Sequence, residues 1–557
     1  MIYNYTMQII KTFLVACIFI IPFNTFAQST LFQQGSKDQI IMERMEIKLQ
    51  TDSLLNFSFL RPFNRKWWMQ SIAQSNQDKL LSAVDQYNLS RARLGNLEWA
   101  GLDSSSTQSK QVLLKTFYKD PANLVKVQQK DFFLSVNPVF SLQLMNDNNS
   151  DQLLYLNTRG AVARGLIANK IGFNLYLTEN QEKPPVFVQQ RVNQFRAVPG
   201  AGLYKRFKEN GFDYFDGRGS VFFNASKFVD VQFGYDKMFL GSGYRSLFMS
   251  DYAASNLFLN LNLHAGRLNY VSRVMELTSQ YTRRVDKDTL FPKKYAVFHH
   301  ISFNAPKWLT IGLFESIVFG RRDHFEFSYL NPVMFLRVAE LQVGSPDNSF
   351  IGFDAKANIA KKVQLYGQVL IDEFNTKYVR QDKGWWGNKW AVQAGLKYID
   401  VMNVKNLDLQ LETNWIRPFT YSHFDTVGNY THYNQPMAHP LMSNVREFIS
   451  ILRYQPAPKW TVQAKAIYWL NGVDTAGKNF GNNIFMSNIS RAAFEGFRYG
   501  SPISKKNLNI NLWAAYEWKE NLFFEVNLNV RKQEGSSNNV FSSIGMRWNM
   551  FRREYDY

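Results

Sequence analysis

The sequence has little cysteine and no long apolar run beyond its first residues, and both absences narrow the choice of fold. Its single cysteine, Cys17, lies in a segment that reads as a leader. The exported chain is therefore expected to form no disulfide and no cysteine metal site. After residue 27, no apolar run reaches the roughly 18 residues that a membrane-spanning helix needs. With a mean hydropathy of −0.29, a membrane protein of this composition has to cross with strands.

Residues 1–27 are predicted to be a secretory signal peptide. Lys11 supplies the positive start, Thr12–Phe23 is the apolar core, and Ala27 precedes the expected cleavage. Leu14–Cys17 imitates a lipoprotein box, but the apolar run continues past the cysteine, which disfavours lipidation. The formal net charge is +19. Because export argues against nucleic acid, the expected polyanions are outer-membrane lipid, lipopolysaccharide and acidic polysaccharide.

Alternation of apolar and polar residues is the main structural signal. In Asn521–Arg531 every even position is apolar, and Glu525, Asn527 and Asn529 occupy odd positions. A period of two indicates a strand with one apolar and one polar face. The same pattern recurs near Phe132, Tyr155, Phe173, Phe222, Val231, Leu259, Val271, Val297, Ile311, Phe353, Leu365, Val392, Leu409, Ile451, Val462, Leu512, Val526 and Ile544. We therefore predict an all-β transmembrane barrel of about 18 antiparallel strands, an even number typical of single-chain bacterial barrels.

The connections between these runs alternate in length, as they do in outer-membrane barrels. The short ones are 168–170, 226–228, 264–267, 304–307, 360–362, 455–459 and 519–521, and the longest are 178–217, 237–255, 320–349, 417–445 and 471–505. The barrel is predicted to span residues 131–557, with its C-terminus and a short tail, Arg552–Tyr557, in the periplasm. Residues 28–130 are predicted to be a partly helical periplasmic region, with helices near Asn64–Ala73 and Leu80–Tyr87.

Polar side chains of the predicted strands are expected to line the lumen, because a charge facing lipid costs roughly 2 to 4 kcal/mol. Asp354, Lys356, Gln364, Gln368 and Asp372 are assigned to this inner face. Two carboxylates on neighbouring strands can act as acid and base in glycoside hydrolysis. Ion pairs with lumenal cations explain Asp354 and Asp372 equally well, and no enzyme activity is predicted.

Residues 383–390 form the loop with the clearest binding signal. Trp385 and Trp386 lie between Lys383 and Lys389, and Trp390 begins the next strand. Indole faces can stack on sugar rings while the lysines hold acidic groups. Barrels also place tryptophan at the membrane interfaces, so both interpretations stay open.

No cofactor or metal site is predicted. Histidines and carboxylates gather at Asp323, His324 and Glu326, and again at His423, Asp425, His432 and His439, but neither spacing matches a metal site. Gly241–Gly243 is expected to be a tight turn, and no Gly-x-Ser-x-Gly, His-Glu-x-x-His or Walker sequence occurs.

Several segments, in order along the chain, resemble the Wzi-like capsule-assembly barrels. They are Met45–Lys48, Met238–Ser246, Phe327–Pro332, Gly344–Asn348, Tyr366–Gln368, Ile371–Phe374 and Asn434–Pro440 with Asn444. Within that group the chain looks most like the Bacteroidota branch, which includes the gliding-motility proteins of the RemB type. The resemblance implies an 18-stranded outer-membrane barrel with periplasmic helices at its N-terminus and no enzyme activity.

The resemblance and the strand pattern together predict a barrel that acts in capsule or exopolysaccharide assembly or surface attachment, linked to gliding motility. Two alternatives stay open. One is an accessory subunit of the type 9 secretion and gliding machinery, with secretion or motility proteins as partners. The other is a plugged diffusion channel, since loops as long as 178–217 can fill the lumen.

Overall fold

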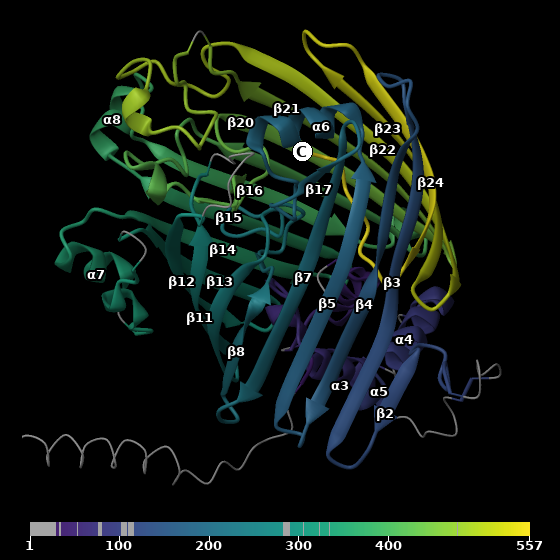
Figure 1. Cartoon of the computed structure of the whole chain (residues 1–557). Helices are drawn as coiled ribbons and strands as arrows, with labels where there is room; N and C mark the ends of the chain where they lie inside the picture. Colours follow the sequence, from purple (N-terminus) through teal and green to yellow (C-terminus); the bar gives the residue numbers. More distant parts are fainter. Residues whose placement is uncertain are drawn as a thin grey trace, which may run out of the picture.

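A closed barrel of eighteen antiparallel strands forms the body of the protein in the computed structural model (Figure 1). The structure describes residues 29–557 except 33–34, 53, 76–80, 102–107, 110–115, 282–289, 305, 322–323, 334 and 476. The predicted signal peptide lies outside these residues. No helix in the described part of the chain is long and apolar enough to cross a membrane.

All eighteen strands predicted from alternation are present, which confirms the predicted fold class. They are β3 (Phe132–Asp147), β4 (Leu154–Ile167), β5 (Ile171–Lys183), β7 (Gly211–Asn224), β8 (Val229–Asp236), β10 (Asn256–Ala265), β11 (Leu268–Thr278), β12 (Lys293–Asn304), β13 (Leu309–Phe319), β14 (Asn348–Ile359), β15 (Val363–Glu373), β16 (Lys389–Tyr398), β17 (Leu407–Ile416), β20 (Val445–Ala457), β21 (Trp460–Gly472), β22 (Ser504–Lys519), β23 (Leu522–Gln533) and β24 (Asn539–Trp548). Each pairs with its neighbour in the chain, and β24 closes the wall against β3.

The two faces of the wall differ as the alternation requires. In β10, Leu257 and Leu259 are exposed on the outside, whereas Asn260 and Asn262 are buried on the inside. Outward leucines in water would be unfavourable, so the exposed apolar belt indicates a wall built for lipid. The inner face is polar, so its side chains need hydrogen-bond and ion-pair partners within the lumen.

One pair of strands extends further than the sequence indicated. The connection predicted at 178–217 is shorter, because Thr178 pairs with Asp216 and Glu182 pairs with Phe212 in a continuation of β5 and β7. The residues of β5 from Thr178 to Lys183 are mostly polar, so alternation could not reveal this part. The connection itself contains α6 (Val186–Phe195).

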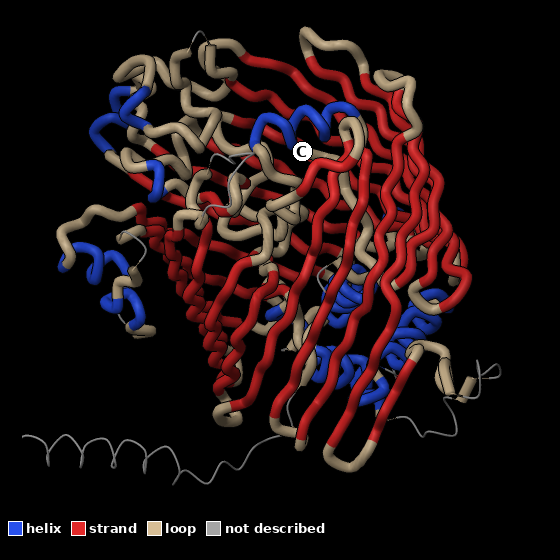
Figure 2. Tube along the Cα trace, in the orientation of Figure 1, coloured by secondary structure: helices blue, strands red, loops and turns tan. Residues whose placement is uncertain are grey.

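The N-terminal helices close the end of the barrel that carries the short turns (Figures 1 and 2). They are α2 (Lys37–Leu49), α3 (Arg65–Ser75), α4 (Ala83–Gly95) and α5 (Leu97–Ala100). Met42, Met45, Trp68, Ile72 and Leu89 form their shared core. Two of the helices correspond to the predicted ones, although residues 76–80 lie outside the described part. The four helices and their connections are called the helical plug below.

Ion pairs attach the helical plug to the wall. Glu43 bonds to Lys397 of β16 at 2.8 Å, and Glu46 bonds to Lys356 of β14 at 2.5 Å. Arg44 bonds to Asp400 in the turn after β16 at 2.6 Å. The inward charges of three elements of the wall are therefore neutralised by one helix, α2.

The long connections fill the lumen from the opposite end. The connection between β8 and β10 descends until its strand β9 (Phe239–Leu240) pairs with β1 (Leu60–Arg61) of the helical plug. Phe57, Leu240, Phe248 and Tyr421, which come from both sides, share one buried core. The lumen is thus occupied by protein that enters from both ends.

The C-terminal tail, residues 549–557, also lies inside the barrel, which corrects the prediction of a short tail, Arg552–Tyr557, in the periplasm. It starts at the short turns, where the Asn549 amide donates to the Asn521 carbonyl, and ends near α6 (Figure 1). Tyr555, Asp556 and Tyr557 are buried. The tail turns inward because cations on the inner wall need carboxylates, and Asp556 supplies one to Lys465 at 2.6 Å.

Removing one member of a buried ion pair should loosen the helical plug. In Lys356→Met, Glu46 stays buried without its cation, so local opening of α2 should become easier by about 3 to 5 kcal/mol. Hydrogen exchange of the α2 amides in detergent micelles measures this opening.

The matched control is Arg159→Met, which removes an exposed wall pair, Arg159–Glu179, with side chains 59% and 49% exposed. Exposed pairs contribute only about 0 to 1 kcal/mol, so α2 exchange should not change. Equal exchange in the two variants would contradict the role assigned to Lys356.

Candidate functional site

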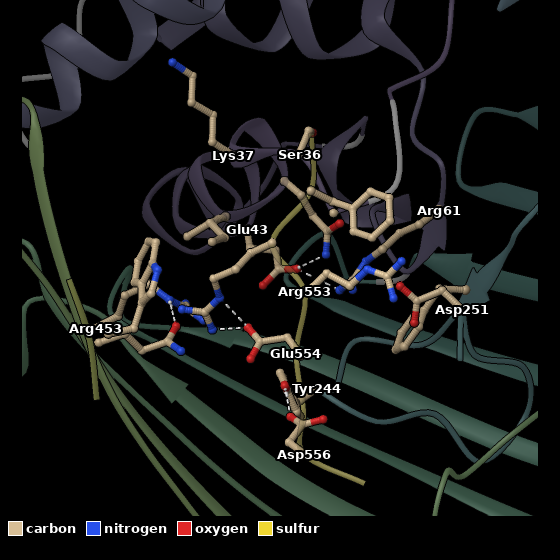
Figure 3. A pocket seen from close by; sticks show the side chains of 18 of the residues that line it. Ser36, Lys37, Glu43, Arg61, Tyr244, Asp251, Arg453, Arg553, Glu554 and Asp556 are labelled. Atoms are coloured by element: carbon tan, nitrogen blue, oxygen red, sulfur yellow. Dashed lines mark hydrogen bonds and ion pairs between the residues drawn. The ribbon is translucent and has the colours of Figure 1, made fainter. Parts of the chain in front are cut away.

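An internal cavity of about 440 Å³ lies between the helical plug, the C-terminal tail and the inner wall. Figure 3 shows side chains from α2, from the connection after β8 and from the tail converging on it. Eleven lysines and arginines and seven aspartates and glutamates line this space. Because cations are in excess, the cavity suits an anion better than a metal cation.

Carboxylates of the cavity are held in their charged form by neighbouring cations. Glu43 bonds to Arg61 at 2.7 Å as well as to Lys397. Burial alone would raise the pKa of Glu43, but these two cations outweigh it and lower the pKa to about 2. Glu43 therefore acts as a permanent anion between the plug and the wall.

The tail contributes a second set of charges to the cavity. Lys465 of β21 bonds to Glu554 at 2.7 Å, and Arg245 lies 3.4 Å from Asp556. Tyr244 also bonds to Asp556 (Figure 3). Burial would raise the pKa of Asp556, yet Lys465 and Arg245 hold it well below its usual range. The tail thus brings two carboxylates to Lys465 of the inner wall and to Arg245 of the connection after β8.

Lys237, just after β8, has a different environment. Its Nζ donates to the Asp251 carbonyl at 3.0 Å, and only 6% of the residue is exposed. Burial, followed by the nearby Arg218 cation, lowers the pKa of Lys237 to about 7. This amine therefore titrates near neutral pH. No pattern in the sequence predicts it.

The five residues assigned to the inner face are inside the barrel and take different partners. Lys356 contacts Glu46 and Ser58 of the plug, and Asp354 bonds to His300 at 2.7 Å. The other three make these contacts: Gln364 with Asn358, Gln368 with the Leu240 carbonyl, and Asp372 with Lys389. Asp354 and Asp372 therefore bond to different side chains, His300 and Lys389, within the packed lumen.

A cluster of aromatic rings lies at the end of the barrel that carries the long connections. Trp385 stacks on Tyr378 of α8 (Thr376–Gln381), with ring centroids 4.2 Å apart and planes 22° apart. Phe494, from the connection after β21, is 51% exposed and borders Trp385 at 6.3 Å. Arg491 lies over the Trp386 ring at 4.3 Å. These five residues are called the outer aromatic cluster.

Lys383 and Lys389, which the sequence placed together beside the tryptophans, are separated by the fold. Lys383 is exposed beside the cluster. Lys389 is fully buried, and its Nζ lies 3.0 Å from Asp372. The alternation of β16 carries this information, because Lys389 shares its parity with Ala391 and Gln393, which are also buried. Arg491 and Phe494 join the cluster from more than a hundred residues away, so the sequence alone could not place them there.

Two histidines of the connection after β17, His432 and His439, take part in separate hydrogen bonds. His439 bonds to Glu447 at 2.8 Å, and His432 accepts a hydrogen bond from the Thr278 amide. Asp323 lies outside the described residues. Within the described part of the chain, no three histidine, cysteine or acidic side chains are grouped as metal ligands.

Comparison with solved structures shows that other outer-membrane proteins share this fold. No family model matches the chain, and no curated protein matches its sequence. A similar solved structure is Wzi of Escherichia coli, described as an outer-membrane protein involved in group 1 capsule assembly and a carbohydrate-binding β-barrel. The match has a TM-score of 0.57 and 12% identity, and it covers 94% of this chain and 100% of Wzi.

Two Pseudomonas aeruginosa proteins match less well. The outer-membrane protein OpdK has a TM-score of 0.42 and 8% identity, with 74% of this chain and 98% of OpdK covered. OprD has a TM-score of 0.41 and 12% identity, with 74% and 94% covered. At such low identities, the match to Wzi shows a shared fold, that of an outer-membrane barrel, and nothing finer.

The filled lumen should not conduct. In planar bilayers the full chain is expected to show no steady current, because the helical plug, the long connections and the tail occupy the barrel. Deleting residues 549–557 leaves β24 intact and removes a segment that runs from one end of the lumen to the other. The helical plug and the long connections remain in this variant, so it should pass current only through the path that the tail leaves. A steady large conductance of the full chain would contradict the closed lumen.

Acid should loosen the helical plug. Glu43 and Asp85 both have pKa values lowered to about 2, from ordinary values of 4.5 and 3.8. Their contribution to stability is complete above the ordinary values and is lost as the pH falls toward about 2. Asp38, whose pKa burial raises to about 6, acts in the opposite sense, so the comparison is made below pH 3.8.

Cleavage of residues 29–101 by pepsin, which is active in this pH range, measures the loosening. Glu43→Gln removes one of the titrating groups and should flatten the profile. Cleavage that is independent of pH below 3.8 would show that these carboxylates do not hold the plug.

Proposed function

We propose that this protein is a non-enzymatic outer-membrane barrel that binds exported acidic polysaccharide at its long connections and holds it at the cell surface. The single observation that carries the proposal is the outer aromatic cluster. Trp385, Trp386 and Tyr378 are half-buried and Phe494 is exposed, and they lie beside Lys383 and Arg491. The cluster thus combines aromatic surface for sugar stacking with attraction for acidic groups.

The electrostatics around the cluster support an acidic polymer. Residues 373–386 and 491–498 contain five lysines and arginines against three aspartates and glutamates. The Nε1 groups of Trp385 and Trp386 have no hydrogen-bond partner among the described residues. The rings are therefore held by packing, by the stacking of Trp385 on Tyr378 and by Arg491 over Trp386.

The filled lumen favours binding over transport. A diffusion channel needs an open path, whereas the helical plug and the connection after β8 meet in the middle of this barrel. The likeness to Wzi, itself a carbohydrate-binding barrel of capsule assembly, agrees with this function. We extend the proposal to the surface polysaccharide of gliding bacteria on the basis of the sequence resemblance.

Removing the stacked ring should weaken polysaccharide binding. Trp385→Ala is expected to lower the affinity about tenfold, which corresponds to about 1.4 kcal/mol, in the range of a lost aromatic contact. Binding of polysaccharide purified from the producing cells, measured by biolayer interferometry on the protein in micelles, tests this. Lys383→Ala should weaken binding mainly at low salt, because exposed charges are screened at high salt.

Trp518→Ala is the matched control. Trp518 is 51% exposed, but it adjoins the turn between β22 and β23, at the opposite end of the barrel. Its loss should leave the affinity unchanged. Equal affinity of the Trp385→Ala variant and the unmodified protein would show that the outer aromatic cluster does not bind the polysaccharide. A deletion strain with normal capsule and normal spreading would argue against the function as a whole.

A further inference from the structure

The connection between β13 and β14, described at residues 320–321, 324–333 and 335–347, lies against the outside of the wall. In Figure 1 its helix α7 (Leu336–Gln342) lies beside β12, away from the mouth of the barrel. Tyr329, Leu336 and Ala339 pack on outward-facing side chains of the wall: Tyr295, Val297, Ile317 and Phe319. The contact is buried and apolar, so it fixes this connection, called the external loop below, to the barrel.

The external loop descends deep along the wall. The Tyr270 hydroxyl donates to the Pro332 carbonyl. Tyr270 is the third residue of β11, counted from the end with the short turn between β10 and β11. The external loop leaves β13 at the opposite end, so it spans most of the height of the wall. An apolar band about 25 Å tall surrounds barrels of this kind, and Tyr270 is well below the end of the wall from which the loop leaves.

Polar groups of the wall bond to the external loop. Glu315 of β13 accepts the Leu336 amide at 2.9 Å, and His299 of β12 bonds to the same carboxylate at 2.9 Å. Tyr270 serves the Pro332 carbonyl, and the Asn331 side chain accepts the Val333 amide at 3.0 Å. Irregular backbone at membrane depth is tolerated only where protein satisfies its polar groups, and these contacts give partners to the Pro332 carbonyl and to the Val333 and Leu336 amides.

The outer face of the external loop is apolar. Phe327, Val333, Phe335 and Leu341 are 75%, 89%, 72% and 57% exposed. The only charged residues from Phe327 to Val343 are Arg337 and Glu340, which form an ion pair with each other. A surface with so many exposed large apolar side chains requires an apolar partner.

The lipid-facing belt of the barrel continues directly into this face. On the strands below the loop, Ile301, Phe303 and Leu313 are also outward and exposed, at 41%, 45% and 56%. At the base of the loop, Arg321 forms two bonds with Asp347, at 2.7 and 2.6 Å, and Tyr329 donates to the same carboxylate. The loop is therefore held in place while its apolar face points outward.

We infer that the external loop inserts Phe327, Val333, Phe335 and Leu341 among the acyl chains of the membrane and forms a lipid-binding ridge on one side of the barrel. The barrel would then meet lipid with a smooth wall on most sides and with this ridge at β11–β13. The partner is membrane lipid, recognised through its hydrocarbon chains.

Spin labelling tests the depth of the ridge. Val333→Cys, in a Cys17→Ser background, is labelled with a nitroxide in the full chain and reconstituted in vesicles of phosphatidylethanolamine and phosphatidylglycerol. Leu313→Cys is the control for lipid, and Ile489→Cys, 65% exposed in the connection after β21, is the control for water. Collisions with oxygen and with a water-soluble nickel chelate report the surroundings of each label.

The ratio of oxygen to nickel accessibility at position 333 is expected to match that at 313 and to exceed that at 489. A ratio that matches position 489 would show that the loop lies in water and would overturn the inference. The same labels are compared in native outer-membrane fragments. Shielding of position 333 from both reagents there, with position 313 unchanged, would identify a protein partner and would also overturn it.

Discussion

The structure depends on one electrostatic constraint, the need to neutralise charges that face the inside of a closed wall. Alternation gives each strand an apolar outer face and a polar inner face, so a barrel that is filled with protein desolvates its inner charges. Lys356, Lys397 and Lys465 each meet a carboxylate that comes from outside the wall. The helical plug and the C-terminal tail are thus the counterions of the barrel as well as its filling.

The sequence predicts the wall well and its filling poorly, for a physical reason. A lipid-facing strand is visible because its alternation is local, and β10 and β23 could be recognised from a few residues each. The wall partner of Glu43, Lys397, lies 354 residues away, and that of Asp556, Lys465, lies 91 residues away. Nothing local distinguishes a plug carboxylate from a surface one. For this reason the sequence predicts a tail in the periplasm, whereas the structure buries it in the lumen.

The candidate site follows the same division. The sequence indicates Trp385 and Trp386 because they lie between two lysines, but Tyr378, Phe494 and Arg491 join them only through the fold. Lys389 lies only three residues after Trp386, but it is part of β16 and its position in the alternation points its side chain to the inner face. Position within a strand therefore decides its surroundings more than nearness in the sequence does. The candidate binding residues of this barrel come together where separate long connections meet, and the alternating pattern of the strands does not reveal such meetings.

The pairing of β1 with β9 sets an order of assembly. Leu60 and Leu240 are neighbours in space but 180 positions apart, and the first five strands of the wall lie between them in the chain. Contacts at such separation carry a high cost in loop-closure entropy until the intervening chain is ordered. The centre of the lumen is therefore expected to form late in folding, after the first hairpins have brought the two segments together.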